Sequence, residues 1–307
     1  MTRSVIAGLD GTPESRAAAA WAAREALLRD RPLLLMHAWK WQPYTYAPLA
    51  GISVPPNGGD PEQKGAQALL DEVEAGIRRR HPELAVSTAE IAEEPVPALM
   101  AAGEQAELLV LGSRGLSGFT GFVVGSVAHG VVARSTVPVV LVRAEESAQA
   151  EHQPDATGRG SVDTPYRDVV LGLDLWHAEA SVLQFAFEAA ARRRAALRVV
   201  HGWTLPPYYY GYDGALDRTL NAQRVTSIRE ELTALLHPWR GKFPEVLVRE
   251  QSRVEGAAHL LLDASLDASL VVVGRRNRRV PLGGHVGPVT QAVLHHCAAP
   301  VAVVPHA

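Results

Sequence analysis

Short apolar runs alternate with longer stretches of helical periodicity along the whole chain. Near the start, mostly apolar residues occupy positions 4–9 and 33–38, two runs with the length of buried strands. The spacing i, i+3, i+4, i+7, i+8, typical of a helix face that packs on a sheet, occurs at Val182, Phe185, Ala186, Ala189 and Ala190. Strands that alternate with such helices predict a parallel sheet with crossover helices.

The first half of the chain is predicted to hold five strands. They are expected at 4–9, 33–38, 85–91, 108–111 and 139–142, with helices between them that include 61–79, 96–102 and 126–135. Five strands joined in this way form an open, doubly wound sheet. Such a sheet binds its ligand in the crevice beyond the carboxyl ends of the strands.

The chain repeats itself, and the repeat predicts two tandem domains. Gly8-Leu9-Asp10 returns as Gly172-Leu173-Asp174, and His37-Ala38-Trp39 returns as His201-Gly202-Trp203, both 164 residues later. The run that ends in Gly112 and the run that begins at Pro138 both return 162 residues later. We therefore expect an α/β protein with two doubly wound, five-stranded, parallel-sheet, Rossmann-like domains at 1–145 and 165–307. The polar segment 146–164 is the expected linker.

Composition narrows the class of protein. The chain has 307 residues, 47% of them apolar, and a formal net charge of -3, so neither a nucleic acid nor an anionic membrane is expected as a partner. A single cysteine, Cys297, excludes an internal disulfide and favours a reducing cytoplasm. The polar start leaves no room for a signal peptide, and no apolar run approaches the ~20 residues that span a bilayer.

A glycine pattern follows the buried run 108–111. Gly112-Ser113-Arg114-Gly115 is followed nine residues later by Gly125-Ser126. Glycine lets main-chain N–H groups approach phosphate oxygens closely, and a helix that begins at Ser126 offers free N–H groups, its positive dipole end and a hydroxyl. Arg114 adds a positive charge. The pattern predicts a phosphate site, although glycines after a strand also occur as ordinary turn residues and Ser126 could serve only as an N-cap.

The tips of the first two predicted strands complete the candidate site. Asp10 is an acceptor suited to a ribose hydroxyl, as acidic residues are in other dinucleotide folds. It could instead cap the next helix, a role that Thr12 could fill equally well. Ala38 could offer main-chain groups to an adenine ring.

These residues resemble the universal stress protein family. The resemblance rests on Gly-x2-Gly-x9-Gly-Ser at 112–126, on Gly8-Leu9-Asp10-Gly11-Thr12 and on the closing Pro-Val-Val-Leu-Val run, and its tandem form is similar to two-domain actinobacterial members. It implies a fold of the adenine nucleotide α-hydrolase type that binds ATP, possibly with Mg²⁺. Adenine would lie near the end of the second strand, ribose at the first loop and phosphates on the glycine loop. The implied ligand residues are Gly8, Leu9, Asp10, Gly11, Ala38, Gly112, Ser113, Arg114, Gly115, Gly118, Gly125, Ser126 and Val127.

The second half departs from this pattern at chemically important positions. Gly115 becomes Asn277, Ser126 becomes Pro288, and Gly11-Thr12 becomes Leu175-Trp176. Proline suits a first helical turn but deletes one N–H and one hydroxyl donor, so anion binding should weaken while the fold survives. Arginines at 275, 276, 278 and 279 could restore phosphate affinity or form only a solvated basic loop. The candidate ligand residues here are Asp174, Gly202, Gly274, Arg275, Arg276 and Gly287.

Three functional classes remain open from the sequence. The first is a nucleotide-binding regulatory protein of the stress response, whose ATP occupancy controls conformation or partner choice. The second is a slow ATP-hydrolysing enzyme, although the chain has no Gly-x4-Gly-Lys-Ser/Thr loop and no evident catalytic residue. The third is an interaction module whose second half has lost its ligand. The closing strands 139–142 and 301–304 could pair within the chain or between two chains of a homodimer, as the family resemblance implies.

Overall fold

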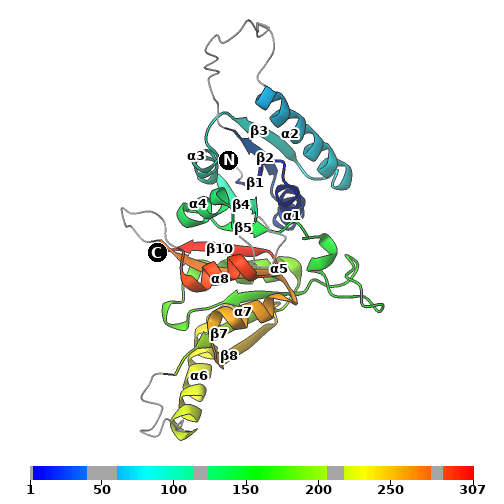
Figure 1. The fold of residues 1–307 in the computed structure, drawn as a ribbon. Coiled ribbons are helices and arrows are strands. Elements are labelled where there is room, and N and C mark those ends of the chain that lie inside the picture. The colour runs from blue at the N-terminus through cyan, green and yellow to red at the C-terminus, as the bar shows by residue number, and fades with distance from the viewer. Residues whose placement is uncertain (1–2, 40–60, 114–123, 206–217, 278–285) are drawn as a thin grey trace, which may run out of the picture.

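The computed structural model describes residues 3–39, 61–113, 124–205, 218–277 and 286–307. Figure 1 shows two α/β halves joined side by side, with β5 of the first half next to β10 of the second. Within the described residues, no helix is long and apolar enough to cross a membrane.

The first half alternates strands and helices as the apolar pattern predicts. Its strands are β1 (Ser4–Leu9), β2 (Leu33–Ala38), β3 (Val86–Ile91), β4 (Ala106–Gly112) and β5 (Val139–Val142). Its helices are α1 (Pro13–Arg29), α2 (Pro61–Arg80), α3 (Pro95–Gly103) and α4 (Ser126–Arg134). Helix α1 begins at a proline behind the N-cap Thr12 and ends at Asp30, whose φ of 52° turns the chain out of the helix.

The second half repeats the order of elements. Its strands are β6 (Asp168–Gly172), β7 (Leu197–Trp203), β8 (Val248–Val254), β9 (Ala268–Arg276) and β10 (Val301–His306). Its helices are α5 (Ala180–Arg193), α6 (Arg218–Lys242), α7 (Ala257–Ser265) and α8 (Pro288–His296). Two short 3₁₀ turns, η1 (Ala148–Glu151) and η2 (Leu175–His177), precede β6 and α5. Arg194 ends α5 with a φ of 50°, as Asp30 ends α1.

The ten strands form one continuous sheet in the order β3-β2-β1-β4-β5-β10-β9-β6-β7-β8. Every neighbouring pair is parallel except β5 and β10, which are antiparallel and pair Leu141 with Val301, Val140 with Ala302 and Val139 with Val303. The prediction of two tandem α/β domains with parallel sheets is confirmed. The pairing of the closing strands, which the sequence left open, takes place within the chain.

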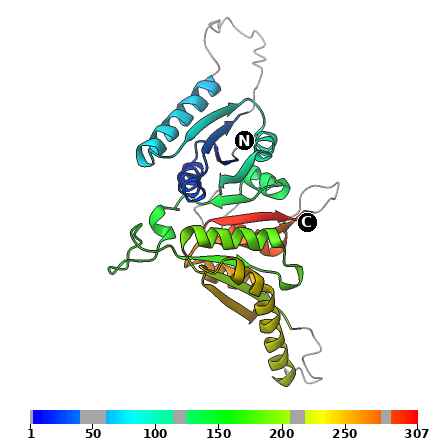
Figure 2. The same ribbon diagram turned by 180° about the vertical axis from the view of Figure 1, so that it is seen from behind.

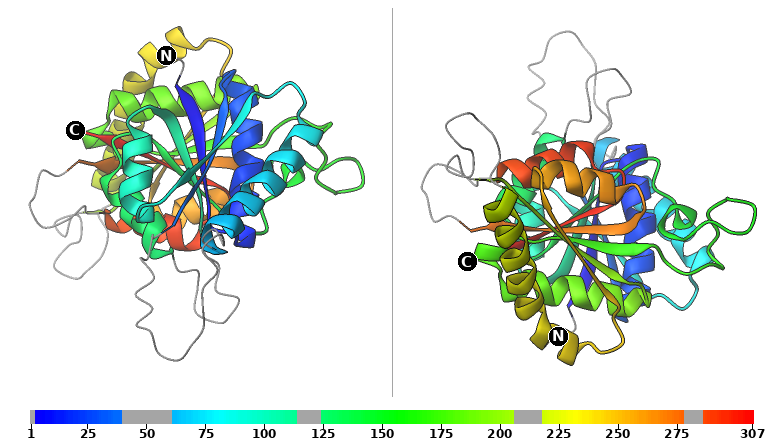
Figure 3. Two further views of the ribbon diagram at one scale, coloured as in Figure 1. Left: turned by 90° about the horizontal axis from the view of Figure 1, so that it is seen from above. Right: turned by 90° about the horizontal axis from the view of Figure 1, so that it is seen from below.

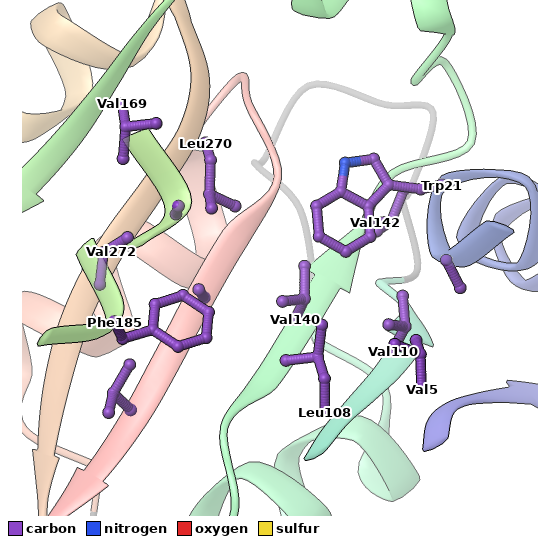
Figure 4. Close-up of a cluster of buried hydrophobic side chains, with 14 of the residues drawn as sticks. Val5, Trp21, Leu108, Val110, Val140, Val142, Val169, Phe185, Leu270 and Val272 are labelled. Atoms are coloured by element: carbon purple, nitrogen blue, oxygen red, sulfur yellow. The ribbon is translucent and has the colours of Figure 1, made fainter. Parts of the chain in front are cut away.

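Both faces of the sheet are covered by helices, and each face has one core that runs through both halves. Helices α1, α2, α5 and α6 cover the face seen in Figure 2, while α3, α4, α7 and α8 cover the face seen in Figure 1. The end-on views of Figure 3 show the sheet between these two helical layers. Figure 4 shows Trp21 of α1 and Phe185 of α5 among the apolar side chains of the first core. Because strand side chains alternate between faces, neither half has a core that is closed off from the other.

A buried group of charges joins α1 to α5 at the junction. Glu25 accepts hydrogen bonds from Arg29 Nε at 2.6 Å and from Arg193 Nη2 at 2.5 Å, and the side chains of all three residues are at most 3% exposed. Burial alone would raise the pKa of Glu25, but the charges of Arg193 and Arg29 lower it to about 2. The carboxylate is therefore held ionised between two guanidinium groups that come from different halves.

The connection between the halves is ordered and packs on α1. The carboxylate of Glu151 in η1 is 3% exposed and accepts a hydrogen bond from Arg24 Nε at 2.7 Å. Glu146 Oε1 lies 3.8 Å from Arg24 Nη2. Burial and the nearby Glu151 carboxylate raise the pKa of Glu146 to about 8, although Arg24 acts in the opposite direction. The polar segment predicted as a linker is therefore attached to the first half by charged side chains.

Substitution of Glu25 should destabilise the whole chain. Glu25→Gln leaves the buried Arg193 guanidinium without its counter-charge and Arg29 with Glu107 alone, a change expected to cost about 3–5 kcal/mol of unfolding free energy. The measurement is urea denaturation at pH 7. Glu72→Gln is the matched control, because Glu72 forms an exposed pair with Arg16, and its loss should leave the unfolding free energy nearly unchanged. Equal costs for the two variants would contradict the role assigned to Glu25.

Glu146 should make stability fall as pH rises. Its pKa is about 8 in the folded chain against an ordinary 4.5, so the folded state keeps a proton that the unfolded state releases between these values. The unfolding free energy should therefore decrease from pH 5 to pH 8, and Glu146→Gln should remove this component. Relative to the wild type, the variant should gain up to about 1 kcal/mol per pH unit. Glu145→Gln, at an exposed neighbouring position, should follow the wild-type profile.

Candidate functional site

The first half has a cavity at the carboxyl ends of its central strands. Its volume is about 100 Å³, and its walls come from β1, β2, β4, the start of α1 and the start of α4. The lining residues are Gly8, Leu9, Asp10, Thr12, Ser15, Met36, Ala38, Pro95, Leu99, Leu111, Gly112, Gly125, Ser126, Val127 and Ala128. This position is where open α/β sheets bind ligands.

The turn after β1 presents Asp10 at the edge of the cavity. Gly11 has a φ of 82°, a conformation that favours glycine, and it reverses the chain between Asp10 and Thr12. The Asp10 carboxylate accepts from the main-chain N–H of Thr12 at 3.1 Å and from the Thr12 hydroxyl at 2.5 Å. Thr12 in turn accepts from Ser15 N at 3.2 Å and caps α1. The N-cap is therefore Thr12, and Asp10 remains exposed at the tip of the strand.

Gly112 is required by a close approach of two backbones. A Cβ atom at this position would lie 2.6 Å from the carbonyl carbon of Glu14 and 2.7 Å from the nitrogen of Ser15. The end of β4 can thus lie against the first turn of α1 only because residue 112 has no side chain. This contact brings the glycine loop and the Asp10 turn to the same cavity.

Helix α4 begins at the opposite wall. Its N-cap is Gly125, which has no side chain to cap the helix, and Ser126 is the first helical residue. Ser126 is therefore not the N-cap, an alternative that the sequence allowed. The first N–H groups of a helix lack intrahelical partners and carry its positive dipole end, so this wall offers donors to an anion.

Most of the predicted ligand residues of the first half meet around this cavity. Gly8, Leu9, Asp10, Ala38, Gly112, Gly125, Ser126 and Val127 all line it. Ser113 does not line it, because it is 6% exposed and its N–H donates to Val142 O at 2.7 Å. Arg114, Gly115 and Gly118 lie outside the described residues. Sequence reasoning overlooked Ser15, whose place in the wall depends on the contact with Gly112.

The second half has a larger cavity in the equivalent place. Its volume is about 470 Å³, and it is lined by Gly172, Leu173, Asp174, Trp176, His177, Glu179, Val182, Val200, His201, Gly202, Ala257, Leu261, Val273, Gly274, Arg275, Arg276, Gly287, Pro288, Val289, Thr290 and His306. The six residues predicted here are all among them. His201, Glu179 and His306 were overlooked; the equivalents of the first two in the first half, His37 and Ser15, were not predicted as ligands either.

Asp174 has a different set of contacts from Asp10. Its carboxylate accepts from Trp176 N at 3.1 Å and lies 2.9 Å from the His177 Nδ1 atom. These contacts hold the short turn η2, which occupies the place of the Gly11-Thr12 turn before α1. The Trp176 indole, 54% exposed, lies edge-on against the His201 ring with 5.2 Å between ring centres. Trp176 thus lies at this end of the cavity, where the first half has Thr12.

The prediction that the Arg275 side chain binds phosphate does not fit its position. The residue is 5% exposed, and its guanidinium crosses the junction to donate to Ala133 O at 3.0 Å and to Ser135 O at the carboxyl end of α4. Burial lowers the pKa of this guanidinium, and the carbonyl ends of the helix are its observed acceptors. Arg275 therefore stabilises the helix whose other end lines the first cavity.

Metal-ligating side chains do not gather in the described part of the chain. No group of three or more His, Cys, Asp or Glu residues there could hold a metal ion. In the first cavity, Asp10 is the one carboxylate among the described lining residues.

Comparison with known proteins gives the family. The model of the universal stress protein family matches residues 1–143 and again 165–305. A universal stress protein of Mycobacterium bovis, Mb2028c, is 28% identical over 97% of this chain and 96% of its own length. The crystal structure of a universal stress protein from Archaeoglobus fulgidus covers 100% of both chains with a TM-score of 0.61 at 14% identity.

A second structure from A. fulgidus is a universal stress protein in complex with dAMP. It is 20% identical to this chain and covers 46% of it and 97% of its own length, with a TM-score of 0.35. Since the family model matches both halves, the chain belongs to the universal stress protein family, as a member with two tandem domains.

Proposed function

We propose that the first cavity binds ATP and that its occupancy serves regulation in a stress response. The observation that carries this proposal is the convergence of Asp10, Gly112 and the start of α4 at Gly125-Ser126 on one cavity. These groups supply an acceptor for ribose and donors for phosphate, which are the two polar ends of a nucleotide. Membership in a family with a member solved with dAMP agrees with an adenine nucleotide as the ligand.

The proposed pose follows from the walls of the cavity. The adenine ring lies at the end of β2, between Met36, Ala38 and Leu99, where apolar side chains and main-chain groups can hold a flat ring. The ribose lies against Asp10. The phosphates lie between Gly112 and the first turn of α4. Mg²⁺ that accompanies the nucleotide would be held chiefly by phosphate oxygens and water, with Asp10 as the nearest protein carboxylate.

A regulatory role fits this arrangement better than an enzymatic one. Asp10 accepts from the Thr12 hydroxyl and Ser126 is the first residue of a helix, roles that suit ligand binding better than the activation of water. Helix α4 spans the distance from the proposed phosphate site to the contact with Arg275, at the junction of the halves. Nucleotide binding at one end of α4 would therefore favour one arrangement of the junction over another.

Ser126→Pro should weaken ATP binding without unfolding α4. Proline is well tolerated at the first position of a helix, and Pro288 occupies this position in the second half. The substitution removes one N–H and one hydroxyl donor to the phosphates, so the dissociation constant should rise at least about tenfold. Isothermal titration of the full chain with ATP measures it, with circular dichroism as the check on folding.

Ser227→Ala, in helix α6 of the second half, is the control and should bind ATP as the wild type does. Mass spectrometry of the purified chain provides an independent test, in which we expect an adenine nucleotide to be carried. An unchanged affinity in Ser126→Pro, or a chain that binds no adenine nucleotide, would overturn the proposal.

A further inference from the structure

The two cavities occupy equivalent places, but at three equivalent positions the second cavity lacks a hydroxyl group that the first has. The offset of the repeat puts Trp176 in place of Thr12, Glu179 in place of Ser15 and Pro288 in place of Ser126. All six residues line their cavities. Each exchange removes a hydroxyl group, and the one side-chain donor gained among the three is the indole N–H of Trp176. The exchange of Ser126 for Pro288 removes an N–H and a hydroxyl donor from the place equivalent to the proposed phosphate site of the first half.

Glu179 adds a charge that opposes phosphate. It is the N-cap of α5 and lines the cavity, with its Oε1 atom 3.7 Å from His306 Nδ1. Together with Asp174 it gives this cavity two carboxylates, whereas the described lining of the first cavity has one. Arg276 is exposed at the rim, and the guanidinium of Arg275 is bound to α4. The described walls of the second cavity are thus unfavourable to a polyphosphate.

His201 offers this cavity a buried polar atom without a partner. The residue is 2% exposed, and its Nδ1 donates to Leu173 O at 3.0 Å. Its Nε2 atom is buried and has no hydrogen-bond partner within the described part of the chain. Since Nδ1 donates to the main chain, Nε2 is the acceptor of the neutral ring, and it belongs to a residue that lines the cavity. A buried acceptor of this kind lowers stability unless a ligand satisfies it.

The first half provides an internal comparison for this histidine. His37 is the equivalent residue, and its Nδ1 also contacts a main-chain oxygen, Leu9 O, at 2.8 Å. His37 does not line the first cavity, and its Nε2 is not a buried atom without a partner. The free Nε2 is therefore a property of the second cavity and not of the repeated fold.

We propose that the second cavity binds a flat nitrogen heterocycle that carries N–H donors and no phosphate. His201 Nε2, Asp174 and Glu179 accept hydrogen bonds from the ligand, and the exposed Trp176 indole provides an aromatic surface for its ring. The contrast with ATP rests on the function proposed for the first cavity. The chain would thus hold two different ligands, one in each half.

Free adenine is the probe, because it is flat and uncharged and has N–H groups. Equilibrium dialysis of the full chain with labelled adenine, at saturating ATP, should give one adenine per chain. His201→Phe keeps an aromatic ring but removes the acceptor, so the affinity for adenine should fall about tenfold. His37→Phe is the control, because it loses the equivalent main-chain contact of Nδ1 in the first half. It should leave adenine binding unchanged. The comparison of the two variants separates the loss of a ligand contact from a loss of stability.

A second variant tests the exclusion of phosphate. Glu179→Ser combined with Pro288→Ser gives the second cavity the residues of the first, and the stoichiometry of ATP should rise from one to two per chain. A stoichiometry that stays at one would show that these residues do not exclude ATP.

The outcomes separate this inference from the function proposed for the first cavity. Adenine binding that saturating ATP abolishes, or that His37→Phe and His201→Phe weaken equally, would overturn the inference. One bound adenine together with no bound ATP would contradict the proposed function alone, and the assignment of the second cavity would stand.

Discussion

The antiparallel pairing of β5 with β10 is the contact on which the rest of the structure depends. It joins two parallel five-stranded sheets edge to edge and removes the exposed edge that each would present alone. The strands of the first half run in the opposite direction to those of the second half. The carboxyl ends of the strands in the two halves therefore point to opposite sides of the molecule, along the strand direction. The cavities that form at these ends are therefore separated by the sheet itself.

The same pairing determines which helices meet. It puts α1 beside α5 on one face, where Glu25 receives guanidinium groups from Arg29 and Arg193. A buried ion pair adds little net stability, but a partner shifted along the helix would leave a charge uncompensated. Apolar side chains such as Trp21 and Phe185 fill the space around this group without fixing the register. The charges thus make one docking of the halves far more favourable than its neighbours.

The two cavities show how one backbone serves two kinds of surface chemistry. Gly112 and Gly274 keep the ends of β4 and β9 free of side chains, since a Cβ atom at either would lie within 3.0 Å of a neighbouring atom. This part of the backbone is the same in both halves. The exchange of Ser15 for Glu179 adds a negative charge to the cavity wall, and the exchange of Ser126 for Pro288 removes two hydrogen-bond donors. Neither change disturbs the helix that follows, because Glu179 precedes α5 and proline suits the first position of α8. The residues that line the cavity can therefore change while the fold stays the same.

The sequence by itself determined the strands, the repeat and most of the first cavity. Strands such as β1 and β2 were predicted to the residue, because most positions of a buried parallel strand are apolar. The run 108–111 was predicted too short, because β4 begins at Ala106 and includes the polar Glu107, whose carboxylate pairs with Arg29. The glycines and Asp10 were found because their roles follow from local chain geometry.

Only the tertiary structure decided the positions that depend on distant segments. Arg275 belongs to a basic run in the sequence, and only the β5–β10 pairing brings the carboxyl end of α4 within reach of its guanidinium. His201 and His37 both follow an apolar run and stand two residues before a tryptophan. The free Nε2 of His201 arises because the ring is fixed to Leu173 and borders a cavity. Periodicity reports which face of an element is buried, whereas the partner of a polar atom is determined by the packing of the whole chain.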